Sequence, residues 1–131
     1  MITEDYVSFE TAKLLKEKGF DEGCSFVINA KSKGIMPVSW PTTNSDIEDE
    51  KASLIALPTI QMAMKWLRKV HNLCIEPYRT AAGYLYTIST IPYGSCKANP
   101  KEGGDDEDSG QWTTYEGAVE AAIKYCLEDL I

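Results

Sequence analysis

The stretch from Leu57 to Ile91 reads LPTIQMAMKWLRKVHNLCIEPYRTAAGYLYTISTI and decides the fold of this chain. Pro58 suits the first turn of a helix, where its missing N–H leaves no hydrogen bond unmade. Apolar residues then recur at helical spacing between Ile60 and Val70. Asn72 is a residue type that readily ends a helix. The stretch therefore predicts a helix that leads directly into the segments that follow it.

Two short alternating runs come after this helix. Residues 73–78 alternate in polarity, and so do residues 84–89, in which Tyr84 and Tyr86 share one face. Residues 80–83 between the runs end in glycine and can form a tight turn. The second half of the stretch therefore predicts a β-hairpin.

The segments on either side predict two more helices and a second hairpin. Ser8 can cap a helix from Phe9 to Lys18, and Thr113 or Thr114 can cap a helix that runs to the end of the chain. Residues 25–30 and 35–40 predict two strands, the second either at a sheet edge or broken at its proline. The predicted order is α-β-β-α-β-β-α, an α+β layer sandwich with an antiparallel sheet packed by helices.

Length and composition are those of one globular domain. The chain has 131 residues, of which 44% are hydrophobic and 25% charged. No apolar run approaches the roughly 20 residues of a membrane-spanning helix. The first residues, MITEDYVSFE, lack the basic and apolar parts of a secretory signal. We therefore expect a single cytoplasmic domain, residues 1–131, without membrane association.

The formal charge of −7 is concentrated in two segments, residues 41–51 and 97–111, which we expect to be mobile surface loops. Nine of the 20 acidic residues and three of the 13 basic residues lie in them, so the other 11 acidic residues nearly balance the other 10 basic residues. Phosphate contacts need clustered Lys and Arg, so direct nucleic-acid binding is not expected. The run GGDDEDSG at residues 103–110 lacks the alternating spacing of a calcium loop, which favours a solvated loop without metal or cofactor.

The cysteines and the single histidine do not form a metal-binding pattern. The cysteines are Cys24, Cys74, Cys96 and Cys126, and no two have C-x-x-C spacing. A zinc site needs ligands at short spacings, so reduced and mostly buried thiols are expected instead. His71 and Cys74 could form a catalytic pair only if the helix continued past Asn72. A histidine that caps its helix is the favoured interpretation.

Three segments resemble a family of small uncharacterised proteins associated with gut Bacteroidetes and their prophages and mobile elements. They are SFETAKLLKEKGF near the start, LPTIQMAMKWLRKVHN in the middle and TYEGAVEAAIKYCLEDLI at the end, somewhat under half of the chain. Gly117 stands where the family usually carries an acidic residue, which makes the match weakest in the first turn of the last helix. The resemblance implies an intracellular protein from a phage-like gene neighbourhood and implies no activity.

Aromatic side chains are the best candidates for a contact surface, because aromatic residues anchor interfaces and stack on bases or sugars. With the single histidine they give the candidate binding residues Trp66, His71, Tyr78, Tyr84, Tyr86 and Trp112. Core packing is favoured for Trp66, and less strongly for Tyr84 and Tyr86. If no helix covers the strand face of these two tyrosines, an aromatic patch is exposed and a partner is implied.

These observations favour a phage-type accessory protein that binds an unknown protein partner through the sheet face or a strand edge. A homodimer stays open. The alternative is an acidic inhibitor that mimics nucleic acid and occupies a host DNA-binding protein, although its carboxylates would need a rigid face. A small enzyme using His71 and a cysteine is the third hypothesis. The sequence has no G-x-S-x-G, Walker, H-E-x-x-H or dinucleotide motif, so no catalytic residue is assigned.

Overall fold

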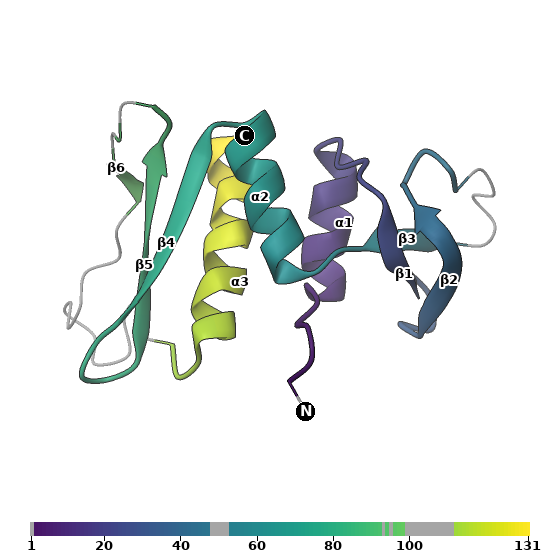
Figure 1. Ribbon diagram of the computed structural model, residues 1–131, viewed down its shortest axis with the longest axis horizontal. Coiled ribbons are helices and arrows are strands. Elements are labelled where there is room, and N and C mark those ends of the chain that lie inside the picture. The colour runs from purple at the N-terminus through teal and green to yellow at the C-terminus, as the bar shows by residue number, and fades with distance from the viewer. Residues whose placement is uncertain (1, 48–52, 93, 95, 99–111) are drawn as a thin grey trace. The chain divides into compact units, whose positions relative to one another are not determined.

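The computed structural model describes residues 2–47, 53–92, 94, 96–98 and 112–131, and it confirms the α+β class (Figure 1). The chain divides into two compact units, Met1–Thr59 and Ile60–Ile131. Each unit contains its own antiparallel sheet of three strands. The two hairpins expected from the sequence are both present, one in each sheet.

The first unit begins with helix α1 and continues into its sheet. Its elements are α1 Phe9–Glu17, β1 Cys24–Asn29, β2 Ile35–Thr42 and β3 Leu54–Leu57. The Ser8 hydroxyl accepts a hydrogen bond from the Thr11 N–H, as expected of a helix N-cap. Gly19 follows the helix with a φ of 93°, a left-handed conformation that suits glycine. The α1 helix packs against β3.

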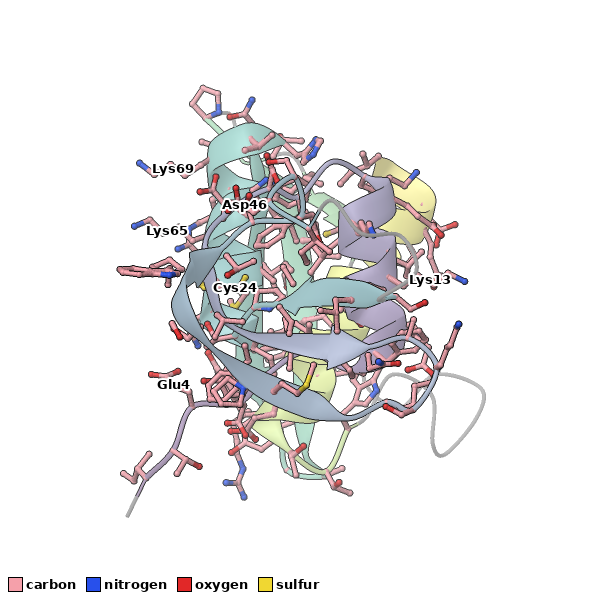
Figure 2. All side chains as sticks on the ribbon, turned by 90° about the vertical axis from the view of Figure 1, so that its right-hand side faces the viewer. Glu4, Lys13, Cys24, Asp46, Lys65 and Lys69 are labelled. Carbon is pink, nitrogen blue, oxygen red and sulfur yellow. The ribbon has the colours of Figure 1, made fainter. Side chains whose placement is uncertain are left out.

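Strand β1 lies in the middle of this sheet, and β2 lies at its edge. The adjacent residues Val27 and Ile28 point to opposite faces, and both are buried. Strand β2 differs, because none of its residues is buried. Pro37 lies in β2, which confirms that the proline marks an edge strand. Figure 2 shows Cys24 on β1 and Lys13 projecting away from α1.

A hydrogen-bonded turn follows β2 and fastens it to the rest of the unit. The Asn44 amide donates to the Phe20 carbonyl (2.8 Å) and accepts from the Ala56 N–H (3.0 Å). The Ser45 backbone N–H and hydroxyl both donate to the Asp21 carboxylate. These two bonds, the backbone one first, hold the pKa of Asp21 below its ordinary value. The attachment is therefore complete above the ordinary carboxyl pKa and is lost as the pH falls through the lowered one.

Replacing Asn44 by alanine is expected to lower the free energy of unfolding by about 1–3 kcal/mol, because the Phe20 carbonyl and Ala56 N–H lose their shared partner. Ser45→Ala, which removes two exposed side-chain hydrogen bonds, to Asp21 and to Thr43, should change it by less than about 0.5 kcal/mol. Chemical denaturation of the two variants beside the wild type measures both values. Equal stability of Asn44→Ala and Ser45→Ala would contradict the bridging role of Asn44.

The second unit consists of the central helix, a hairpin with one added strand, and the C-terminal helix. Its elements are α2 Ile60–Val70, β4 Leu73–Arg79, β5 Tyr84–Thr90, β6 Cys96–Ala98, α3 Tyr115–Tyr125 and a final π-helical turn, η2 Cys126–Leu130. Asn72 ends α2 with a φ of 56°, as its residue type predicts. The Thr114 hydroxyl caps α3 by accepting from the Gly117 N–H. Helix α3 runs alongside β4 and β5 (Figure 1).

The loop boundaries differ from those expected. Pro41 and Thr42 belong to β2, and residues 43–47 form the hydrogen-bonded turn. Lys97 and Ala98 belong to β6, which pairs with β5. The rest of both predicted loops, residues 48–51 and 99–111, lies outside the described residues. In the part of the chain that is described, no helix is long and apolar enough to cross a bilayer.

Candidate interaction surfaces

The six candidate residues fall in three places within the second unit. Tyr84, Tyr86 and Trp112 lie together on one face of the β4–β5 hairpin. Trp66 and His71 lie together at the end of α2. Tyr78 is opposite Leu85 in the hairpin, on the other face of the sheet, and is 40% exposed.

Trp112 is joined to β5 by a pair of backbone hydrogen bonds. The Tyr84 N–H donates to the Trp112 carbonyl (2.7 Å), and the Trp112 N–H donates to the Tyr84 carbonyl (3.0 Å). Directly opposed residues of an antiparallel pair point to the same face, so the Trp112 indole lies on the face of Tyr84 and Tyr86. The Tyr86 and Trp112 rings are 5.3 Å apart between centroids and inclined by 39°. Two residues far apart in the sequence thus form one aromatic wall.

A groove of about 320 Å³ runs between this aromatic wall and α3 with its π-helical turn. On the helix side it is lined by Ala121, Lys124, Tyr125, Glu128 and Asp129. These positions recur at three- and four-residue steps, so they form one stripe along the helix. The stripe ends in the wider turn, Cys126–Leu130, and π-helical turns occur frequently at functional sites. The groove combines three aromatic side chains with two carboxylates and one amine.

Tyr86 is buried at the bottom of this wall, with 5% of its surface exposed. Burial raises the pKa of its phenol, and nearby Tyr125, Cys126 and Asp129 raise it further. Tyr86 therefore packs in the core, the outcome that the sequence weakly favoured, and its side chain also lines the groove. Helix α3 covers part of the strand face that carries Tyr84 and Tyr86. The aromatic patch considered for this face is therefore limited to the groove.

Trp66 is buried in the core, as favoured by its position in α2. Its ring meets the His71 ring edge to face at 4.7 Å. The His71 N–H donates to the Leu67 carbonyl and completes the last turn of the helix. The buried Nε2 atom of His71 has no hydrogen-bond partner among the described residues. This histidine packs at a helix end, where its ring contacts the Trp66 ring.

The thiols do not gather into a reactive site in the described part of the chain. The left-handed Asn72 turns the chain, and Cys74 lies on β4 with its thiol directed to the Glu76 carboxylate (3.9 Å). Cys24 and Cys126 are buried, as expected. Burial raises the pKa of Cys24 to about 11 and that of Cys126 to about 12. No group of three or more described His, Cys, Asp or Glu residues could hold a metal ion.

Native-state alkylation with iodoacetamide at pH 7 should therefore modify Cys74 before Cys24 and Cys126. The thiolate is the reacting form, and the raised pKa values of Cys24 and Cys126 reduce its population by roughly a hundredfold or more. Mass spectrometry of peptides from a time course measures the three rates. Unfolding in guanidinium should make the rates similar, and fast modification of Cys126 in the folded protein would contradict its burial.

Strand β2 carries exposed residues that are not among the six candidates. Trp40 is 79% exposed, Ile35 57% and Met36 43%. Trp40 ends the strand predicted for residues 35–40, and the sequence predicts no function for it. The sequence feature that could have pointed to this surface is the pair of prolines, Pro37 and Pro41, because prolines are typical of edge strands. The exposure itself could not be read from the residue pattern.

A bulge in β2 accounts for the exposure of Trp40. Phe26 is opposite Pro37 and Cys24 is opposite Thr42, so two steps along β1 match five steps along β2. Strand β2 thus has three residues more than β1 in this interval, within residues 38–41, and bulges at sheet edges redirect side chains. Gly23 accommodates this bulge, because a Cβ atom at Gly23 would lie only 2.9 Å from the Pro41 Cβ. The sequence thus places an indole on an irregular part of an edge strand.

Compared with known proteins, this chain matches no family model, no curated protein and no solved structure.

Proposed function

We propose that this chain is a protein-binding domain that contacts its partner through the side chains of β2, with Trp40 as the anchor. The observation that carries the proposal is the 79% exposure of Trp40 on the bulge of an edge strand. Tryptophan is enriched among the residues that contribute most to protein interfaces, because it buries a large area with few rotatable bonds. Ile35 and Met36 at the start of the same strand are also exposed.

The prolines of β2 favour side-chain contacts over the addition of a partner strand. Pro37 and Pro41 have no N–H, so two of the eight residues of β2 cannot donate to a neighbouring strand. Two copies of the chain pairing through this edge would lack these donors on both strands. The proposed occupant is therefore a different protein with an apolar pocket for the Trp40 indole, and not a second copy.

The fastening of β2 supports the same proposal. The Asn44 and Ser45 hydrogen bonds fix the end of the strand, and Pro41 packs against Gly23. A side chain held by a fixed backbone loses less conformational entropy when it binds than one on a mobile loop. The bulge therefore keeps the backbone at Trp40 in one conformation before a partner binds. The phage-type origin implied by the sequence resemblance remains part of this proposal.

Site-specific photo-crosslinking tests the proposal. A chain with benzoylphenylalanine at position 40 should give one crosslinked protein from the source cells, and a chain with the same residue at Lys13 should not, because α1 projects that side chain elsewhere. Excess unlabelled wild-type chain should compete the adduct away, whereas excess Trp40→Ala chain should not. Adducts of equal yield from positions 40 and 13, or an adduct that is a second copy of this chain, would contradict the proposal.

A further inference from the structure

We propose that the groove between β5 and α3 binds the side chain of an arginine residue presented by a peptide segment of another protein. This site lies in the second unit and does not depend on the Trp40 surface. Its volume of about 320 Å³ is at the lower end of the range for ligand pockets. The inference rests on the kind of side chains that line the groove and on where their charges lie.

The aromatic lining suits a flat cation. Tyr86 and Trp112 form one wall, with ring centroids 5.3 Å apart, and Tyr125 belongs to the opposite stripe. Aromatic faces attract cations, and the planar guanidinium group of arginine stacks on them better than an ammonium group does. Tyrosine and tryptophan also have one polar atom each that can face the ligand or water. A purely aliphatic ligand would use only part of this lining.

The charges of the lining select a cation over an anion. Glu128 and Asp129 provide two carboxylates, and Lys124 provides one ammonium group, so the net charge is −1. Lys124 lies four residues before Glu128, on neighbouring turns of the helix, and offsets that carboxylate in part. Asp129 also contributes to the raised pKa of Tyr86, so its negative charge acts on the aromatic wall of the groove. A guanidinium between the rings and Asp129 would meet both attractions at once.

The length of the helix stripe favours a peptide over a free small cation. From Ala121 to Asp129 the chain advances eight residues, which is roughly 12 Å in a helix. A guanidinium group occupies only part of that length, so adjoining peptide groups would contact the rest. Glu128 and Asp129 are both exposed. They would also repel the carboxylate of a free amino acid, whereas a peptide bond carries no charge there.

Titration with short capped peptides tests the assignment. The probes are acetyl-Gly-Arg-Gly-amide, its neutral citrulline analogue, the lysine analogue and free L-arginine, added to the ¹⁵N-labelled full chain and followed by NMR. The arginine peptide should shift the indole N–H signal of Trp112 and the amide signal of Tyr86 and leave the indole signal of Trp40 in place. Its affinity should exceed that of the citrulline peptide by at least about fivefold, and that of the lysine peptide and free arginine by a smaller factor.

Matched charge variants distinguish binding in the groove from general attraction of the peptide to the negative charge of the chain. Asp129→Asn should weaken binding of the arginine peptide by about three- to tenfold. Glu116→Gln removes the same charge from an exposed position of α3 outside the groove and should change it by less than about twofold. Equal affinity for the citrulline peptide, an equal effect of both variants, tighter binding of free arginine, or no shift of Trp112 at 10 mM peptide would each overturn the assignment.

Discussion

The Trp40→Ala variant is expected to bind the partner protein at least about thirtyfold more weakly than the wild type, because hot-spot residues contribute about 2 kcal/mol or more when truncated. Its stability should stay within about 0.5 kcal/mol of the wild type, since the side chain is 79% exposed and fills no part of the core. Calorimetric titration with the purified partner protein, once crosslinking has identified it, measures the affinity. Thermal unfolding of the same samples measures the stability.

Two further variants show whether position as well as residue type matters at this surface. Tyr78→Ala removes another exposed aromatic side chain, in the other unit, and should change the affinity by less than about threefold. Gly23→Ala keeps Trp40 but forces Pro41 away, so it should weaken binding measurably while Trp40 is still present. Full affinity of Trp40→Ala, or equal losses in Trp40→Ala and Tyr78→Ala, would contradict the role given to β2.

The second large effect is expected at Gly83, the last residue of the hairpin turn. A Cβ atom there would overlap the carbonyl oxygen of Trp112, which accepts the hydrogen bond from the Tyr84 N–H. A backbone atom cannot rotate away as a flexible side chain can, so the strand pair must separate. Gly83→Ala should therefore lower the free energy of unfolding by about 2–4 kcal/mol and change the environment of the Trp112 indole.

Gly19→Ala is the control for this result. Gly19 has a φ of 93° with nothing near the position of a Cβ atom, so the substitution adds backbone strain without a collision. Its cost should be about 1 kcal/mol. Chemical denaturation compares the two variants, and tryptophan emission follows Trp112. A Gly83→Ala variant as stable as Gly19→Ala, with unchanged emission, would show that the Tyr84–Trp112 pair does not position the aromatic wall.

The helices could be predicted from the sequence because their signals are local. Ser8 and Thr114 cap α1 and α3, and Asn72 ends α2, each through groups within four residues. The hairpins were predicted for the same reason, since alternation and the Thr80–Gly83 turn specify the pairing of β4 with β5. The burial of Trp66 followed from its place in a helix with a wide apolar arc.

The short strands and both candidate surfaces depend on contacts between distant residues. β3 is a run of four apolar residues, and β6 has three residues with no recognisable pattern, so neither differs from a loop in the sequence. Trp112 joins Tyr84 across 28 positions of the chain, which no local pattern predicts. Trp40 owes its exposure to a bulge whose register is set by β1. The residue types could be selected from the sequence, but their assembly into surfaces could not.

The most direct test of the account is ¹⁹F NMR of the chain labelled with 5-fluorotryptophan, which reports separately on Trp40, Trp66 and Trp112. In the free protein the Trp40 resonance, assigned with Trp40→Phe, should show the largest shift between H₂O and D₂O, because its indole is the most exposed of the three. Saturation with the identified partner should move this resonance and remove most of its solvent shift, as expected for an indole buried in a pocket. A Trp40 resonance that keeps its position and its solvent shift in the saturated complex would contradict the proposed function.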